Sequence, residues 1–98
     1  MTPAARIAAA IEVLDEIARH RTPADTTLKA WGKGHRFAGS KDRRAIAERV
    51  YAVLRARGRL AWIMGADSGR ALVLASLVHL DGLEPAEVAG LFLSLIHI

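Results

Sequence analysis

The hydrophobic residues near the start of the chain repeat with the spacing of an amphipathic helix. One apolar stripe along residues 3–20 is formed by Ile7, Ile11, Leu14 and either Ile17 or Ala18. Thr2 and Pro3 mark the start, because a threonine hydroxyl caps a helix and proline is tolerated at the first helical position. The pattern fades at His20, where we expect the first helix to end.

Two further helices are predicted in the middle of the chain. The second is short, and its signals are Thr22-Pro23 at the start, Leu28 and Trp31 on one face, and Gly32 and Gly34 at the end. The third is predicted over residues 41–57, with Ser40 as its cap and Gly58 as its stop. It has the clearest periodicity in the sequence, with a buried face formed by Ile46, Val50, Val53 and Leu54.

After the third helix, the pattern predicts a short helical turn and then an apolar helix. We expect the turn, around residues 60–64, to pack Trp62 inward. The following helix has Asp67 or Ser68 as its cap. It is apolar on nearly all sides over residues 71–80, so we expect it to lie in the centre of the fold.

The last predicted helix completes an entirely helical pattern. Pro85 begins it, and Val88, Leu91 and Phe92 are its expected inner residues. No segment alternates between apolar and polar residues as a half-buried strand would. The sequence therefore predicts an all-α fold, a small helical bundle with a single core.

The charge of the chain is unevenly distributed. Residues 19–59 hold twelve of the fourteen Lys and Arg but only three acids, a local net charge of +9. The remaining residues hold two Arg and seven acids, a net charge of −5. Such an asymmetry favours a polyanionic partner, and RNA or DNA is the expected class.

Nine residues of this basic segment are candidates for RNA binding: Lys33, Arg36, Lys41, Arg43, Arg44, Tyr51, Arg55, Arg57 and Arg59. Lys41, Arg43 and Arg44 fall at the start of the third predicted helix, where positive charge opposes the helix dipole and brings no structural benefit. Arg55 and Arg57 fall at its end, where the same dipole favours them, so a structural role is an alternative for both. Arg43 also lies near the apolar side and could instead pair with a buried carboxylate.

Aromatic residues could add base stacking to these contacts. Tyr51 lies on the charged side of its predicted helix and is the most open candidate. Trp31 and Trp62 are expected to pack in the core instead. Phosphate contacts by Lys and Arg would give affinity and salt dependence without sequence specificity.

The sequence offers no catalytic or metal-binding motif. It has no cysteine, its four histidines (20, 35, 79 and 97) lack the spacing of metal ligands, and no glycine-rich phosphate loop is present. Acidic residues interrupt the apolar stretch that an N-terminal signal peptide requires. The longest nearly apolar run, residues 71–80, is far shorter than the roughly 20 residues that cross a bilayer. We therefore expect a cytoplasmic protein that does not bind a membrane.

The stretch FAGSKDRRAIAERVYAVLR, residues 37–55, resembles the corresponding helix of NusB-like domains. That helix carries a pattern of the type D-R/K…ELVYGVLR, which stands here as Asp42-Arg43, Glu48, Val50-Tyr51 and Val53-Leu54-Arg55. Two groups of proteins share the domain: free-standing NusB antitermination factors and RsmB-type (Sun/Fmu) 16S rRNA 5-methylcytosine methyltransferases. The segments TPAARIAAAIEVLDEI and RTPADTTLKAWGKGHRFAGSKDRRAI are similar to alphaproteobacterial members of the methyltransferase group, whereas the Arg-rich start usual in NusB is absent.

The resemblance extends over nearly all of residues 1–92 and implies a NusB-like helical bundle, incomplete at its C-terminus, that helps to hold 16S rRNA. In the methyltransferases a separate Rossmann-like domain binds S-adenosylmethionine and carries the nucleophilic cysteine. The resemblance thus implies an S-adenosylmethionine-dependent parent enzyme whose catalytic domain lies in cis, outside these residues, so that this fragment holds no cofactor. The alternatives are a stand-alone NusB-like antitermination factor that binds RNA, and a helical protein-interaction domain whose basic surface is only solvated.

The last six residues differ in composition from the rest of the chain. The sequence before them is rich in Ala and Arg, whereas Leu93 to Ile98, LSLIHI, contains neither. The codons CTG TCT CTT ATA CAC ATC, which match a transposon mosaic-end adapter used in sequencing libraries, translate to this string. We interpret residues 93–98 as adapter sequence following a partial RNA-binding domain, with a natural helical tail as the alternative.

Overall fold

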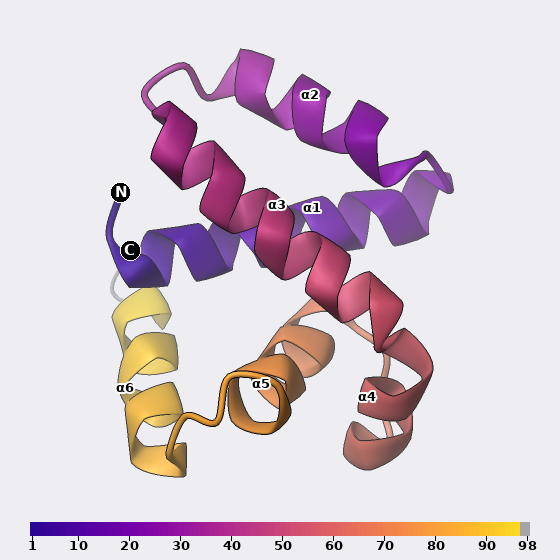
Figure 1. Cartoon of the computed structure of the whole chain (residues 1–98), viewed down its shortest axis with the longest axis vertical. Coiled ribbons are helices and arrows are strands. Elements are labelled where there is room, and N and C mark those ends of the chain that lie inside the picture. The colour runs from indigo at the N-terminus through magenta and orange to yellow at the C-terminus, as the bar shows by residue number, and fades with distance from the viewer. Residues whose placement is uncertain (97–98) are drawn as a thin grey trace.

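The computed structural model describes the backbone of residues 1–96 and the side chains of residues 1–93. Within that range all regular secondary structure is helical and no strand occurs, so the predicted all-α fold class is confirmed. The helices are α1 (Pro3–His20), α2 (Ala24–Gly34), α3 (Ser40–Arg55), α4 (Arg57–Met64), α5 (Gly69–His79) and α6 (Pro85–Ile96). Figure 1 shows α1 and α3 crossing in the middle of the molecule, with α2 above them and α4, α5 and α6 below.

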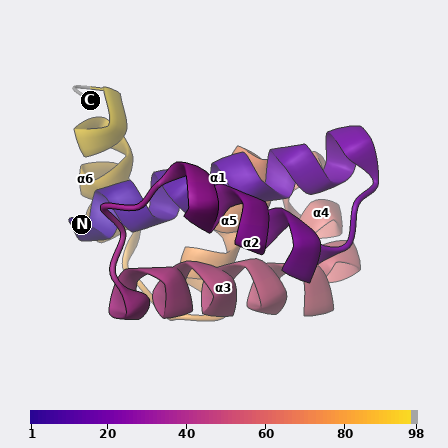
Figure 2. The same ribbon diagram turned by 90° about the horizontal axis from the view of Figure 1, so that it is seen from above.

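The first helix begins and ends where the sequence predicted. The hydroxyl of Thr2 accepts a hydrogen bond from the Ala5 amide at 3.0 Å, as expected for a helix cap. At the other end Arg21 adopts a left-handed conformation with φ of 53°, and its amide donates to the Ile17 carbonyl at 2.8 Å. This closing turn reverses the chain, so that α2 packs back across both α1 and α3 (Figure 2).

The central position predicted for the apolar helix is confirmed in α5. This helix contacts α1, α3, α4 and α6, and its buried residues are Gly69, Ala71, Leu72, Val73, Ala75, Ser76 and Leu77. Ser68, one of the two predicted caps, accepts a hydrogen bond from the Ala71 amide at 3.2 Å. The fully buried hydroxyl of Ser76 donates to the Val73 carbonyl at 2.7 Å and accepts from Arg49 at 3.3 Å, so its polar atom is satisfied.

A glycine allows α1 to approach the first turn of α5 closely. The Asp15 carboxylate accepts a hydrogen bond from the Gly69 amide at 2.9 Å, which places a negative charge at the N-terminus of α5. A Cβ atom at position 69 would lie 2.5 Å from that carboxylate and 2.8 Å from the Ile11 carbonyl oxygen. The packing of α1 against α5 therefore depends on the missing side chain.

Two helix starts differ from the prediction. Ser40 is the first residue of α3 rather than its cap; Gly39 occupies the cap position, and its amide donates to the Asp42 carboxylate at 3.3 Å. A carboxylate three residues into a helix that reaches back to the cap amide replaces the expected hydroxyl. α2 begins without a side-chain cap, because the Thr22 hydroxyl hydrogen-bonds that of Thr27 at 2.8 Å.

The prediction that Trp62 packs inward is wrong, and so is the predicted end of the third helix. α3 stops at Arg55, and α4 starts at Arg57 after a single linking residue, Ala56, whose backbone (φ −108°, ψ 12°) departs from helical geometry. This break redirects the chain, so that Leu60 becomes the fully buried residue of α4. Trp62 is 84% exposed.

The last helix follows the predicted pattern as far as it is described. Val88 is buried, and Leu91 and Phe92 are partly buried against the core. The adapter interpretation of residues 93–98 stays a prediction, because the side chains from residue 94 onward and all of residues 97 and 98 lie outside the described part of the chain.

None of the six helices is by itself both long and apolar enough to cross a bilayer. α4 and α5 meet the length and hydropathy requirements only as a pair, and the two are bent by 98° where they join. Most residues of α5 are buried against other helices, as expected for the central helix of a globular bundle.

Candidate nucleic-acid interface

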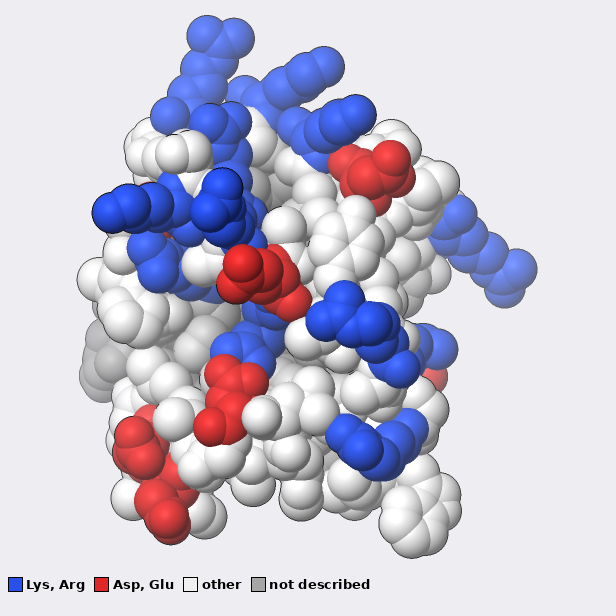
Figure 3. All heavy atoms as spheres, in the orientation of Figure 1, with Lys and Arg blue, Asp and Glu red and all other residues white. Residues whose placement is uncertain are grey.

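Six exposed cations gather on α2, on the loop that follows it and on the first turns of α3. We call this surface the α2–α3 basic face, and its members are Lys29, Lys33, Arg36, Lys41, Arg43 and Arg44. Figure 3 shows Lys and Arg side chains crowding the upper part of the molecule, over α2 and the start of α3. Five of the six were predicted as RNA-binding residues, and the fold brings them to one surface.

Lys29 is the residue of this surface that the sequence reasoning missed. It lies four residues before Lys33 on α2, and residues with this spacing share one face of a helix. The spacing was visible in the sequence and could have identified Lys29.

The cations of the basic face differ from the arginines that hold the fold together. Arg6 pairs with Asp42 at 2.8 Å, and Arg49 donates to Asp81 at 2.7 Å. In residues 1–93, none of the six cations of the basic face forms an ion pair or a side-chain hydrogen bond. The alternative that Arg43 pairs with a buried carboxylate is therefore wrong, because Arg6 holds the nearest such group, Asp42.

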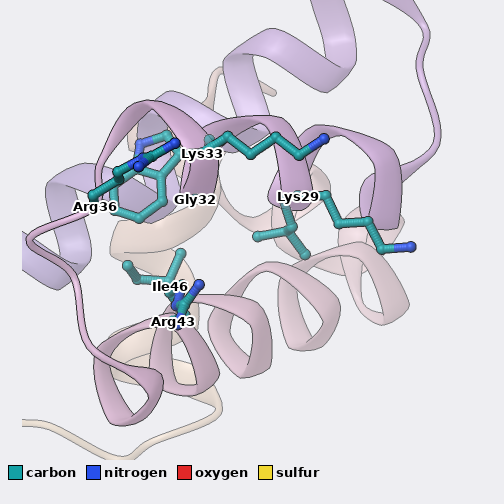
Figure 4. A pocket seen from close by; sticks show the side chains of 8 residues that line it. Lys29, Gly32, Lys33, Arg36, Arg43 and Ile46 are labelled. Atoms are coloured by element: carbon teal, nitrogen blue, oxygen red, sulfur yellow. The ribbon is translucent and has the colours of Figure 1, made fainter.

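The basic face encloses a groove between α2 and α3. The groove has a volume of about 500 Å³, with Lys29, Lys33, Arg36 and Arg43 around it and Leu28, Trp31 and Ile46 as its apolar floor. Figure 4 shows Arg43 and Ile46 rising from α3 toward α2, with Lys29 and Lys33 extending outward from α2. Four cations thus border an apolar hollow that no acidic residue lines.

Gly32 explains how a long arginine side chain fits inside this groove. A Cβ atom at position 32 would lie 3.4 Å from Cδ of Arg43, so the aliphatic stem of the arginine packs directly over the glycine. Gly32 was predicted only to end the second helix. In the structure it also lets the Arg43 side chain approach the backbone of α2 closely.

Trp31 supports the loop between α2 and α3. As predicted, it packs in the core, with 9% of its surface exposed. Its ring stacks on His35 with 4.1 Å between centroids, and the His35 Nδ1 atom lies 2.7 Å from the Trp31 carbonyl oxygen. Phe37 then contacts the edge of the His35 ring and remains 73% exposed. This stack orders the loop that presents Arg36.

Asp42 fixes the first turn of α3 beneath the exposed cations. It is largely buried and accepts hydrogen bonds from Arg6 at 2.8 Å and from the Gly39 amide at 3.3 Å, with the Met1 amino group 3.4 Å away. The Arg6 hydrogen bond is the main cause that lowers the pKa of Asp42 below 3.8; the Gly39 amide adds to the effect, and partial burial opposes it. The ionised carboxylate also offsets the positive charge that its neighbours bring to this helix end.

The remaining predicted RNA-binding residues lie apart from the basic face. Arg55 is at the other end of α3, roughly 20 Å from Lys41 at the rise of an α-helix. Arg55 and Arg59 border a separate hollow of about 700 Å³ at the α3–α4 junction, whereas Arg57 lies 3.8 Å from Asp67. The sequence predicted one interface of nine residues, and the structure divides its cations into two groups.

Tyr51 lies between the two groups, in the second half of α3. Its side chain is 37% exposed, on a helix whose buried residues include Val50 and Val53. The prediction that this ring is open to a partner is therefore compatible with its placement.

Neither a cluster of metal-binding side chains nor the strand of a Rossmann-like unit occurs in the described part of the chain. Residues 1–93 contain no cluster of three His, Asp or Glu side chains that could hold a metal. A Rossmann-like cofactor site needs a strand followed by a glycine-rich turn and a helix, and residues 1–96 contain no strand.

Comparisons with known proteins add no assignment to this geometry. A scan against protein-family models found no match, and searches among curated proteins and solved structures also found none.

Proposed function

We propose that this domain binds RNA through the α2–α3 basic face. The observation that carries the proposal is the set of six exposed cations that have no acidic partner within the described chain. Cations that are not neutralised within the fold create a positive potential that attracts polyanions and releases counterions when phosphates bind. Arg6 and Arg49, which do have acidic partners, are accounted for by the fold itself.

The groove favours a nucleic acid over a simple polyanion. Its apolar floor lies beneath a border of cations, an arrangement in which a base or ribose contacts Leu28 and the exposed edge of Trp31 while phosphates contact Lys33 and Arg43. Its volume of about 500 Å³ falls within the range of sites that hold ligands of nucleotide size. A polyanion without bases would leave this apolar surface uncovered.

The proposal extends to 16S rRNA through the resemblance of residues 37–55 to NusB-like domains. In an RsmB-type methyltransferase this domain would hold the rRNA, and a further domain in cis would bind S-adenosylmethionine and methylate the cytosine. Gene sequence beyond the codon for Phe92 tests this part. An open frame that continues into a glycine-rich turn and a Pro-Cys motif supports the methyltransferase, and a stop codon soon after α6 favours the free-standing factor.

RNA binding itself is tested by titrating the protein into labelled 16S rRNA fragments across a salt series. The wild-type affinity should fall steeply with salt, and Lys33→Glu combined with Arg43→Glu should weaken binding by about thirtyfold or more near 0.1 M salt. The matched control is Arg19→Glu, which changes the charge of an exposed arginine on α1 that pairs with Glu16. Circular dichroism of each variant shows whether the helices remain intact.

The outcomes separate the proposal from the protein-interaction alternative. Weak wild-type binding with a flat salt response would refute RNA binding and leave the basic face as a solvated surface. Equal losses in the Arg19 control and in the Lys33, Arg43 double variant would show that net charge, rather than the groove, determines affinity. A loss confined to the double variant, with unchanged helicity, supports the α2–α3 basic face as the binding surface.

A further inference from the structure

The side of the molecule opposite α2 carries an apolar trough. It runs along α5, between α4 and α6, and has a volume of about 450 Å³. Apolar side chains form most of its lining: Met64, Leu74, Val78, Val88 and Phe92. Arg70, the arginine that lines the trough, lies over the Phe92 ring, with 5.2 Å between its Cζ atom and the ring centroid, in a cation–π contact.

Three exposed apolar residues on α4 and at the end of α5 lie within two residues, along the chain, of Met64 and His79, which line this trough. Trp62 is 84% exposed, Ile63 is 39% exposed and Leu80 is 38% exposed. Scattered exposed apolar residues are normal, but a large aromatic side chain beside an apolar hollow is typical of a protein interface. Trp62 does not pack in the core of its own chain. An interface with a second chain would bury it.

The two flanks of the trough carry opposite charge. On the α4 flank, residues 55–66 contain three Arg and no acid; Arg57 lies 3.8 Å from Asp67, whereas Arg55 and Arg59 have no acidic partner in the described chain. On the α6 flank, residues 82–93 contain two acids, Glu84 and Glu87, and no Lys or Arg, and neither acid forms an ion pair in the described chain. Figure 3 shows acidic side chains gathered at the lower left, on the side where Figure 1 places α6.

We propose that a second copy of this chain covers the trough, forming a two-fold symmetric dimer. Two face-to-face arrangements are possible, and the charges distinguish them. A two-fold axis parallel to α5 places α4 of each copy against α6 of the other, so that Arg55 and Arg59 meet Glu84 and Glu87. An axis perpendicular to α5 in the plane of the interface would place like charges against each other. Charge complementarity therefore selects the parallel axis.

The dimensions of this side suit a dimer interface. The molecule measures 28 × 20 Å across the side that carries the trough, because its longest axis runs vertically in Figure 1. A stable protein interface buries about 800 Å² per partner, so a dimer would cover this whole side of the molecule and not the trough alone. In this arrangement Trp62 enters the interface as its largest apolar anchor.

Sedimentation velocity over a concentration series tests the dimer. The wild-type mass should rise from the 10.6 kDa of one chain toward twice that value. Trp62→Ala should raise the dimer dissociation constant about tenfold or more. Phe37→Ala is the matched control, because Phe37 is also an exposed aromatic residue but lies beside α2.

A charge exchange tests the orientation of the two copies. Arg55→Glu with Arg59→Glu should weaken the dimer, as should Glu84→Arg with Glu87→Arg, and mixing the two double variants should restore a heterodimer. Three outcomes overturn the proposal: a monomer at every concentration, a dimer unaffected by Trp62→Ala, or a mixture that does not recover. The Lys33, Arg43 double variant should dimerise normally, so a failure of the dimer and a failure of RNA binding are distinguishable.

Discussion

The two sides of this small bundle carry the same kinds of residue, basic and apolar, in different arrangements. On the α2–α3 basic face, cations surround a groove and have no acidic partner. On the opposite side, Arg55 and Arg59 lie toward α4 and Glu84 and Glu87 lie toward α6, on separate sides of an apolar trough, and none of these four forms an ion pair within the described chain. The first surface is complementary to a polyanion, and the second is complementary to itself. Position in the fold, rather than residue type, separates the two roles.

The largest expected effect contrasts a buried with an exposed residue of α4. Leu60→Ala should lower the free energy of unfolding by about 2–5 kcal/mol, because Leu60 is fully buried and its truncation leaves a cavity. Trp62→Ala should change it by no more than about 0.5 kcal/mol in dilute protein, where the chain is monomeric. Urea unfolding of both variants measures the difference. A large loss for Trp62→Ala would mean that the tryptophan packs within its own chain.

A second contrast concerns arginines with and without acidic partners. Arg49→Ala should destabilise the fold by about 1–2 kcal/mol, because it removes the partly exposed pair with Asp81 and a hydrogen bond to the buried Ser76 hydroxyl. Arg44→Ala should leave stability within about 0.5 kcal/mol of the wild type. Thermal or urea unfolding tests both. Equal losses would show that Arg44 has a structural role and would remove it from the basic face.

Charge reversal at the start of α3 should separate binding from stability. Lys41→Glu with Arg44→Glu should weaken RNA binding about tenfold at low salt and reduce its salt dependence, across all RNA sequences tested. The same change should leave stability unchanged or raise it by about 0.3–1 kcal/mol per residue, because acids at a helix N-terminus favour the dipole. Anisotropy titrations and urea unfolding measure the two quantities. Unchanged affinity would exclude these residues from the interface.

Tyr51 tests how far the RNA-binding surface extends along α3. If a base stacks on it, Tyr51→Ala should weaken binding by about 1 kcal/mol, the low end for stacking, because the ring is only partly exposed. Tyr51→Phe keeps the ring and should retain the affinity. A loss of helicity in the alanine variant would instead assign the side chain to packing on α3.

The smallest expected effect is a loss of stability at acid pH through Asp42. The pKa of Asp42 is lowered in the folded chain, so its carboxylate contributes stability that is fully present above pH 3.8 and is lost as the pH falls through the folded-state pKa. Near neutral pH no dependence on this group is expected. Urea unfolding below and above pH 3.8 measures the change, and Asp42→Asn should remove this part of it. An NMR titration that gives Asp42 an unshifted pKa would contradict the Arg6 pairing.

Much of the fold could be predicted because it depends on local patterns. The start and end of α1, the central place of α5 and the inner residues of α6 follow from periodicity and capping residues that are adjacent in sequence. The prediction failed at α4, where one non-helical residue, Ala56, changes which side of the chain faces the core. Helical periodicity predicts the buried face beyond such a break only if the direction of the next helix is known. The sequence around Ala56 does not indicate that direction.

The candidate RNA-binding surface was predicted in composition but not in arrangement. Charge counting found five of its six cations, because an excess of Lys and Arg is visible without a structure. It could not show that Arg55 lies some 20 Å from Lys41, that Arg57 faces Asp67, or that Arg59 borders a separate hollow. Nor could it show that Gly32 lets the Arg43 side chain approach the backbone of α2 closely and border a groove.

The sequence by itself determined that this chain is helical, basic in its middle and without a catalytic motif, because helix signals and net charge are sums over neighbouring residues. The tertiary structure decided which cations have acidic partners and which apolar residues remain uncovered. Arg6 reaches Asp42 across 36 residues, and Asp15 reaches Gly69 across 54. Such contacts depend on how helices cross, and the crossing geometry is set by the packing of the whole core.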